Sequence, residues 1–195
     1  MTTSAVGSES STIVNVAVPP SSVVGPPIAE TVIPATSSSL FVTATSAAGH
    51  KVLDIMRVKP GCVITDVARP LDMSPEDIAK RPDVLVIESG EIELPGEVRM
   101  KSIGLPDRVA YACLAETIVL ALEGRYENFT VGRSISWPKV KEIYRLGLKH
   151  GMKLATISGV NGPYSDEDFE RVRSAALATR AAQAEAIAAE SVESA

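Results

Sequence analysis

The sequence has few cysteines, histidines and aromatic residues. Its 195 residues include two cysteines, Cys62 and Cys113, two histidines and only 4% aromatic side chains, and the formal net charge is −5. A zinc site needs about four closely spaced ligands, whereas the two cysteines lie far apart in the sequence and only two histidines are present. We therefore expect no metal. Few aromatic rings and no long cluster of cations disfavour nucleic-acid binding, which depends on stacking and on phosphate neutralisation.

Long hydrophobic runs and an early positive charge are also missing. Apolar runs such as the one from Val84 to Ile87 are far below the roughly 20 residues that a membrane span needs. The first Lys or Arg of the chain is Lys51, whereas a secretory signal begins with basic residues before a compact apolar core. We therefore expect no transmembrane segment, a cytoplasmic location and reduced thiols.

Composition divides the chain into three parts. Residues 1–37 are rich in Ser, Pro and Val, which predicts a low-complexity and mostly disordered leader. Residues 38–160 alternate short apolar strands with short helical pieces, which is typical of an α/β domain. Residues 161–195 predict a last helix, capped near Ser165, that continues into an Ala/Glu-rich tail.

Three strand candidates define the predicted fold, at residues 40–45, 62–67 and 84–88. They are continuously apolar rather than alternating, which indicates burial on both faces and a parallel sheet covered by helices. A Gly-rich phosphate loop is absent, because no two glycines are separated by a single residue. The sequence therefore predicts a partial Rossmann-like parallel sheet, the second half of a doubly wound nucleotide-binding domain, with additional C-terminal helices.

The loops after these strands are candidate cofactor contacts, because ligands of open parallel sheets bind at the carboxyl ends of the strands. Thr45, Ser46 and Ala47 follow the first strand, Asp66 ends the second, and Gly90 follows the third. Small residues there let a flat ring or a ribose approach the backbone. Ordinary strand-to-helix turns are the alternative interpretation.

Cys113 is the candidate nucleophile. A strand expected to end near Ala112 places Cys113 at the start of a helix, where the positive end of the helix dipole favours the ionised thiol. Glu116 follows one helical turn later on the same side and could act as an acid, a base or an orienting neighbour. The alternative is that Cys113 is a small buried apolar residue.

A further helix is expected from Trp137 to about His150. It begins with Ser136 and Pro138, a typical N-terminal pattern, and ends before Gly151. We expect Trp137 to pack at the helix entry and His150 to interact with the helix dipole.

The motifs around Cys113 resemble a known family. They are Ala112–Cys113–Leu114–Ala115–Glu116, Leu122–Glu123–Gly124, the segment 128–133 and Lys149–His150–Gly151. In order and spacing, the chain from about Leu40 to about Leu154 resembles the C-terminal half of the long-chain acyl-acyl carrier protein reductases. The resemblance implies NADPH as cofactor, an acyl carrier protein or acyl-CoA thioester as substrate, a thioester on Cys113 and a fatty aldehyde as product. The Gly-rich N-terminal unit of that family has no counterpart here.

Three functional hypotheses follow. The first is an NAD(P)-dependent acyl-thioester reductase with Cys113 as nucleophile, in which the missing Gly-rich unit leaves the activity of this chain alone open. The second is an inactive Rossmann-like remnant or subunit that assembles as a homo-oligomer or with a complementing chain, because half a doubly wound sheet leaves an unpaired strand edge. The third is another NAD(P)-dependent dehydrogenase, similar to the shikimate or glutamyl-tRNA reductases.

Overall fold

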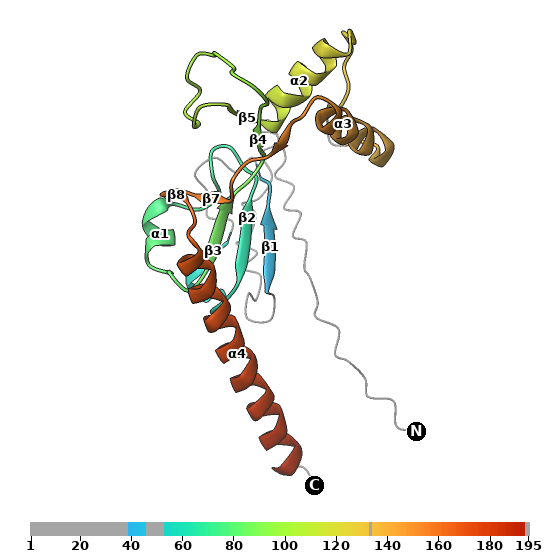
Figure 1. The fold of residues 1–195 in the computed structure, drawn as a ribbon. Helices are drawn as coiled ribbons and strands as arrows, with labels where there is room; N and C mark the ends of the chain where they lie inside the picture. Colours follow the sequence, from blue (N-terminus) through green and yellow to red (C-terminus); the bar gives the residue numbers. More distant parts are fainter. Residues whose placement is uncertain (1–38, 46–52, 133, 194–195) are drawn as a thin grey trace, which may run out of the picture. The chain divides into compact units, whose positions relative to one another are not determined.

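The computed structural model describes residues 39–45, 53–132 and 134–193, and the predicted leader at 1–37 lies outside this part of the chain. The chain divides into two compact units. Unit 1 comprises the residues up to Ser89 together with those from Ile157 onward, and unit 2 runs from Gly90 to Thr156. Figure 1 shows the elements of both units.

Unit 1 is built on a five-stranded sheet in the order β1-β2-β3-β7-β8. The strands β1 (Leu40–Thr43), β2 (Val63–Asp66) and β3 (Leu85–Glu88) are parallel to one another. Two short strands extend the sheet: β7 (Ser158–Gly159) pairs antiparallel to β3, and β8 (Gly162–Pro163) pairs antiparallel to β7. The predicted parallel sheet of an α/β fold is therefore confirmed.

The core of unit 1 comes from the continuously apolar strands. Phe41, Ile64 and Val86 lie on neighbouring strands and are fully buried, which is what strands covered on both faces require. Cys62 belongs to the same core. A short 3-10 helix, η1 (Ile55–Arg57), and helix α1 (Pro75–Ala79) pack around it. The side chain of Ser74 caps α1 by accepting a hydrogen bond from the Asp77 N–H at 3.2 Å.

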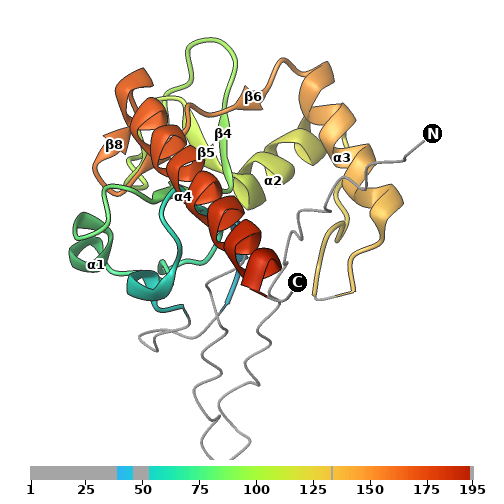
Figure 2. The same cartoon turned by 90° about the horizontal axis from the view of Figure 1, so that it is seen from below.

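The last helix of unit 1, α4 (Asp166–Glu193), is the long red helix of Figure 2. Ser165 begins it through a reciprocal cap. Its N–H and hydroxyl donate to the Asp168 carboxylate at 2.9 and 2.8 Å, and its hydroxyl oxygen accepts the Asp168 N–H at 3.2 Å. Its first turns pack on the rest of unit 1, since the guanidinium Nε–H of Arg171 donates to the Pro82 carbonyl at 2.9 Å. A Cβ on Gly61 would lie 2.2 Å from the Ala176 backbone, so only glycine permits this close approach.

Unit 2 has its own three-stranded antiparallel sheet in the order β5-β4-β6. Its strands are β4 (Glu91–Glu93), β5 (Val109–Tyr111) and β6 (Lys153–Leu154). Helices α2 (Ala112–Leu122) and α3 (Trp137–Lys149) complete the unit. The strand expected before Cys113 is therefore present as β5, but it belongs to this separate sheet.

The core of unit 2 lies between the sheet and the two helices. Its buried residues are Leu94, Ala110, Ala115, Val119 and Met152. Ile143 and Leu146 of α3 pack against them, although no residue of α3 is itself fully buried. Helix α3 is therefore attached along one side only.

Across the described residues, no helix combines the length and the apolar character that crossing a membrane would require.

Candidate functional site

Cys113 occupies the first turn of α2, directly after the strand β5. The start of the helix is held by the backbone, because the Ala112 N–H donates to the Gly90 carbonyl at 2.7 Å. Cys113 is exposed, whereas Cys62 is completely buried. The alternative interpretation of Cys113 as a buried apolar residue is therefore wrong, and its role as a nucleophile stays a prediction.

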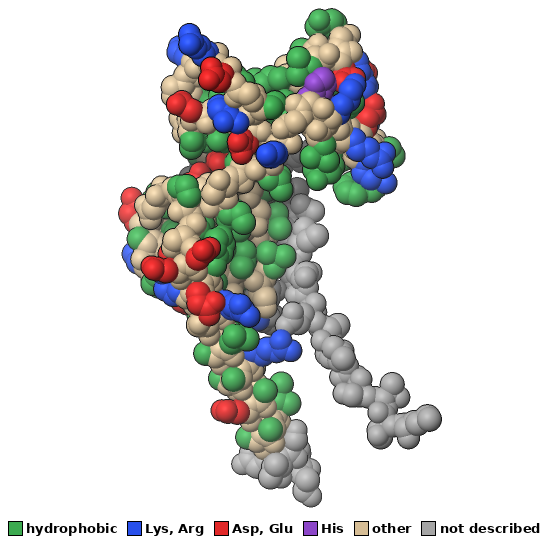
Figure 3. Space-filling model, in the orientation of Figure 1, with side chains coloured by type: hydrophobic (Ala, Val, Ile, Leu, Met, Phe, Trp, Pro, Cys, Tyr) green, Lys and Arg blue, Asp and Glu red, His purple; other side chains and the backbone are tan. Residues whose placement is uncertain are grey.

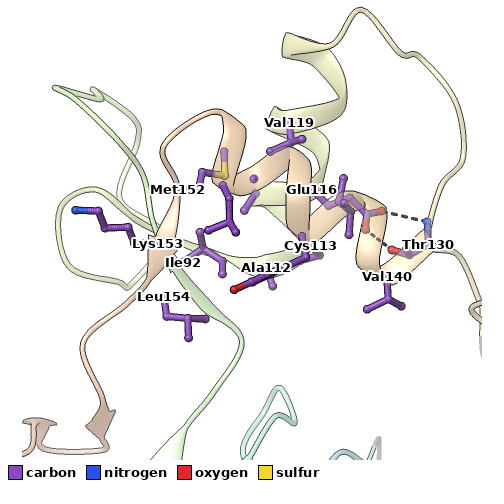
Figure 4. Close-up of a pocket in the computed structure, with 15 residues that line it drawn as sticks. Ile92, Ala112, Cys113, Glu116, Val119, Thr130, Val140, Met152, Lys153 and Leu154 are labelled. Atoms are coloured by element: carbon purple, nitrogen blue, oxygen red, sulfur yellow. Dashed lines mark hydrogen bonds between the residues drawn. The ribbon is translucent and has the colours of Figure 1, made fainter. Parts of the chain in front are cut away.

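A cavity of about 390 Å³ lies beside Cys113 within unit 2. Helix α2 lines it with residues spaced three and four apart, so that one helical face meets the cavity. Helix α3, the strands β4 and β6 and the loop before α3 supply the other walls (Figure 4). Most of the side chains that line the cavity are aliphatic or aromatic. The complete lining consists of Ile92, Ala112, Cys113, Ala115, Glu116, Val119, Thr130, Val140, Ile143, Tyr144, Gly147, Leu148, Met152, Lys153 and Leu154.

Glu116 is the carboxylate of the cavity wall, and it pairs with Thr130. One carboxylate oxygen accepts the Thr130 N–H at 3.2 Å and the other accepts the Thr130 hydroxyl (Figure 4). These bonds tie the loop before α3 to α2, so Glu116 holds one wall of the cavity in place. Its expected role as an acid, a base or an orienting neighbour of Cys113 stays a prediction.

Thr130 is the residue of this site that sequence reasoning missed. Thr130 lies within the motif 128–133, but the motif does not indicate its partner. Thr130 and Glu116 are fourteen residues apart in the chain with a loop between them, so no helical or strand periodicity predicts their contact. Its contact with Glu116 is visible only once α2 and the loop are placed together.

A second polar cluster joins the ends of α2 and α3. The Glu123 carboxylate accepts hydrogen bonds from the Lys149 ammonium at 2.7 Å and from the His150 ring at 2.6 Å. The bond from Lys149, followed by that from His150, lowers the pKa of Glu123. This cluster ties the end of α2 to the end of α3, and the expected interaction of His150 with the helix dipole stays a prediction.

The residues predicted to bind a cofactor fall into both units. Thr45 and Asp66 belong to unit 1, whereas Gly90, Cys113 and Glu116 belong to unit 2. Ser46 and Ala47 lie outside the described residues. The predicted cofactor and catalytic residues are therefore not brought together within one compact unit.

Asp66 acts within its own loop. It is 1% exposed at the end of β2, and burial raises the pKa of its carboxyl. Its two carboxylate oxygens accept the backbone N–H groups of Ala68 at 3.0 Å and of Asp72 at 2.8 Å. Asp72 in turn accepts the Thr45 hydroxyl. These bonds shape the turn that follows β2, as an ordinary strand-to-helix connection requires.

Comparison with known proteins finds similarity over part of the chain. No family model matches the chain. The chain is similar to the aminotransferase PigE of Serratia sp. (strain ATCC 39006), with 42% identity over 115 residues. That alignment takes in 57% of this chain and 13% of the relative, so the chain spans about an eighth of the relative's length. Because unit 2 is shorter than the aligned segment, the similarity extends into unit 1.

This similarity corrects the family and the function predicted from the sequence. The relative is named as an aminotransferase, so the resemblance to the acyl-acyl carrier protein reductases is wrong. The predictions of an oxidoreductase, of a fatty aldehyde product and of an acyl carrier protein or acyl-CoA substrate depended on that resemblance and are withdrawn. The alternatives of an inactive remnant and of another dehydrogenase do not match the relative either. The expectation of an enzyme agrees with the relative's name, although the class of reaction differs.

The cofactor prediction is corrected as well, because an aminotransferase points to pyridoxal phosphate rather than NADPH. Pyridoxal phosphate needs a lysine amine for its aldehyde and an acidic or basic partner for its ring nitrogen. Among the described residues of the cavity wall, the lysine is Lys153, whose amine points away from Cys113 and Glu116 in Figure 4. Glu116 is occupied by Thr130. The cavity therefore does not fit this cofactor.

Proposed function

We propose that this chain supplies the substrate-holding part of an amino-group-transferring enzyme. In this proposal, the cavity of unit 2 binds the apolar tail of a carbonyl compound, and Cys113 holds the carbonyl carbon. The similarity to an aminotransferase supports the class of reaction. The observation that carries the proposal is the exposed Cys113 thiol on the wall of a cavity that is otherwise almost entirely apolar.

The chemistry follows from the groups that meet in the cavity. Transfer of an amino group interconverts an amine and a carbonyl compound, and a thiol adds reversibly to a carbonyl carbon. In this addition the sulfur–carbon bond forms, the π bond of the carbonyl breaks, and the thiol proton ends on the former carbonyl oxygen. The product is a hemithioacetal, and the step requires no oxidant or reductant.

The walls of the cavity determine which carbonyl compound is held. Val119, Val140 and Leu148 offer hydrocarbon surface, which favours an aliphatic tail over a polar one. The two carboxylate oxygens of Glu116 accept hydrogen bonds from Thr130, so the wall does not present an unsatisfied acceptor to the ligand. We expect affinity to rise with the length of the tail until the cavity is full.

The proposed thiol chemistry also bears on the cellular compartment of the protein. Both cysteines of the chain are free, and a thiol that must remain reactive requires a reducing compartment. We therefore place the reaction in the cytoplasm.

The test measures protection of Cys113 against alkylation. Burial raises the pKa of the Cys62 thiol to about 12, so N-ethylmaleimide at neutral pH modifies Cys113 alone, as intact mass would show. We expect decanal to slow this modification much more than acetaldehyde at the same concentration. The Cys113→Ser variant serves as the unlabelled control. Equal protection by the two aldehydes, or protection by neither, would contradict the proposal.

A further inference from the structure

Helix α3 exposes a row of large apolar side chains. Trp137 is 66% exposed, Tyr144 60% and Leu148 53%. The spacing of seven and then four residues places all three on one face of the helix. The opposite side of α3 packs on unit 2 through Ile143 and Leu146. Trp137 therefore does not pack at the helix entry, as the sequence had suggested, but faces outward.

Basic side chains flank this row. Lys141 and Arg145 are exposed and lie beside it by the helical repeat of α3. The Lys141 ammonium lies 5.6 Å from the centre of the Trp137 ring, which keeps the two groups on the same surface. We call these five residues the α3 stripe. Figure 3 shows hydrophobic and basic side chains next to one another over α3.

The charge of unit 2 differs in sign from that of the chain. Between residues 90 and 156 there are ten Lys or Arg and eight Asp or Glu, although the whole chain has a net charge of −5. Within α3, four basic residues accompany the single acid Glu142. Positive charge is therefore gathered where the apolar row is exposed, which favours an anionic partner.

The α3 stripe also forms the rim of the cavity. Tyr144 and Leu148 belong to the stripe and line the cavity, and Leu154, which is exposed too, lines it beside them. An apolar ligand could therefore pass from an apolar surface into the cavity without crossing water. Trp and Tyr prefer the boundary between hydrocarbon and lipid headgroups, and Lys and Arg beside them pair with anionic headgroups.

We propose that the α3 stripe docks unit 2 onto the surface of an anionic lipid bilayer. Trp137, Tyr144 and Leu148 enter the headgroup region, while Lys141 and Arg145 contact lipid phosphates. A bilayer fits better than an acidic protein, because it supplies both the negative charge and the hydrocarbon that the exposed row and the cavity rim require. The proposal does not depend on the reactivity of Cys113.

Trp137 makes the test direct, because it is the single tryptophan of the chain. The full chain is titrated with vesicles of three parts phosphatidylcholine to one part phosphatidylglycerol, and with vesicles of phosphatidylcholine alone. We expect a blue shift of the Trp137 emission and co-sedimentation with the anionic vesicles, both weakened by salt. Brominated lipid in the anionic vesicles should quench the same emission.

Two charge-reversal variants make the test specific. Each basic residue near an anionic surface contributes about fivefold in affinity, so Lys141→Glu/Arg145→Glu should bind these vesicles at least about thirtyfold more weakly. The matched control is Arg99→Glu/Lys101→Glu, which makes the same change at exposed positions of unit 2 away from α3. The control should bind as the parent does. Circular dichroism would show that both variants are folded.

Three results would overturn the proposal. They are an unchanged Trp137 emission in anionic vesicles, an equal loss of binding in the two double variants, and binding of a poly-glutamate peptide without binding of vesicles. The last result would assign the α3 stripe to an acidic protein. Cys113→Ser should bind vesicles as the parent does, so a failure of the proposed thiol chemistry and a failure of docking are distinguishable.

Discussion

Gly147 offers a way to change the cavity without disrupting the fold. It lies inside α3 and lines the cavity, and a Cβ built on it meets only the Met152 Cβ, at the ordinary contact distance of 4.0 Å. Glycine in a helix interior costs about 0.5–1 kcal/mol relative to alanine. Gly147→Ala should therefore increase the free energy of unfolding by about that amount, measured by urea denaturation followed by circular dichroism.

Gly124 provides the matched control, because it also has open space around its Cα but adopts a φ of +67°. Gly124→Ala should destabilise the chain by about 1 kcal/mol, since alanine tolerates this conformation poorly. If Gly147→Ala destabilised the chain as well, the helix interior would be more crowded than the structure shows, and the reasoning would be refuted.

A larger side chain at the same position tests the cavity itself. Gly147→Leu projects an aliphatic group into the space that we assign to the tail of the ligand. Forcing a ligand against such a group costs about 1–3 kcal/mol, which corresponds to a loss of roughly five- to 150-fold in affinity. Decanal should then no longer protect Cys113 at concentrations that protect the parent. Unchanged protection would show that the aldehyde binds elsewhere.

Three further predictions concern the contacts that support the two units. Thr130→Val removes the hydroxyl that donates to Glu116. We expect the free energy of unfolding to fall by about 0.5–1.5 kcal/mol and decanal to protect Cys113 less well against alkylation. Full protection of Cys113 would rule out a positioning role for the contact between Thr130 and Glu116. Asp168→Asn should reduce the helix content of α4 measured by circular dichroism. The cap at Ser165 and the ion pair with Arg171 lower the pKa of Asp168 to about 2. The Asp168 carboxylate therefore stabilises the fold above the pKa that Asp168 has in the unfolded chain, and this stabilisation is lost as the pH falls through the pKa in the folded chain. A difference in helix content between the parent and Asp168→Asn that persisted at the lowest pH would contradict this origin. Gly61→Ala should destabilise unit 1 by about 1–3 kcal/mol in urea denaturation, because its Cβ would overlap the α4 backbone, and an unchanged midpoint would contradict the packing of α4.

The parallel strands and most helix boundaries could be predicted from the sequence, because local patterns determine them. The apolar runs of β1, β2 and β3 have no polar alternation, and Ser136 with Pro138 is a typical helix start. Helix α3 begins and ends where expected. The position of Cys113 at the start of α2 followed from the same reasoning.

The antiparallel sheet of unit 2 could not be predicted in this way. Strands β4 and β6 contain three and two residues, which is too short for a period of two to be recognised. Their pairing joins residues such as Ile92 and Leu154 that lie far apart in the chain, and only tertiary packing selects it.

The cavity and the partner of Glu116 were missed for a related reason. Side chains from two helices, two strands and a loop enclose the cavity, and no single segment carries a signal for it. Trp137 was misplaced because an aromatic residue at a helix start usually packs inward, whereas α3 is attached only through its opposite side. The predicted family was wrong because the motifs around Cys113 are only three to six residues long, which is too short to distinguish one family from another.

A resonance from the carbonyl carbon of a bound aldehyde would test the central claim most directly. The parent chain is mixed with decanal labelled at its carbonyl carbon, and the carbon spectrum is recorded. The account predicts a hemithioacetal signal that disappears in Cys113→Ser and weakens strongly in Gly147→Leu. Signals of free and hydrated aldehyde alone, or the same bound signal in Cys113→Ser, would contradict it.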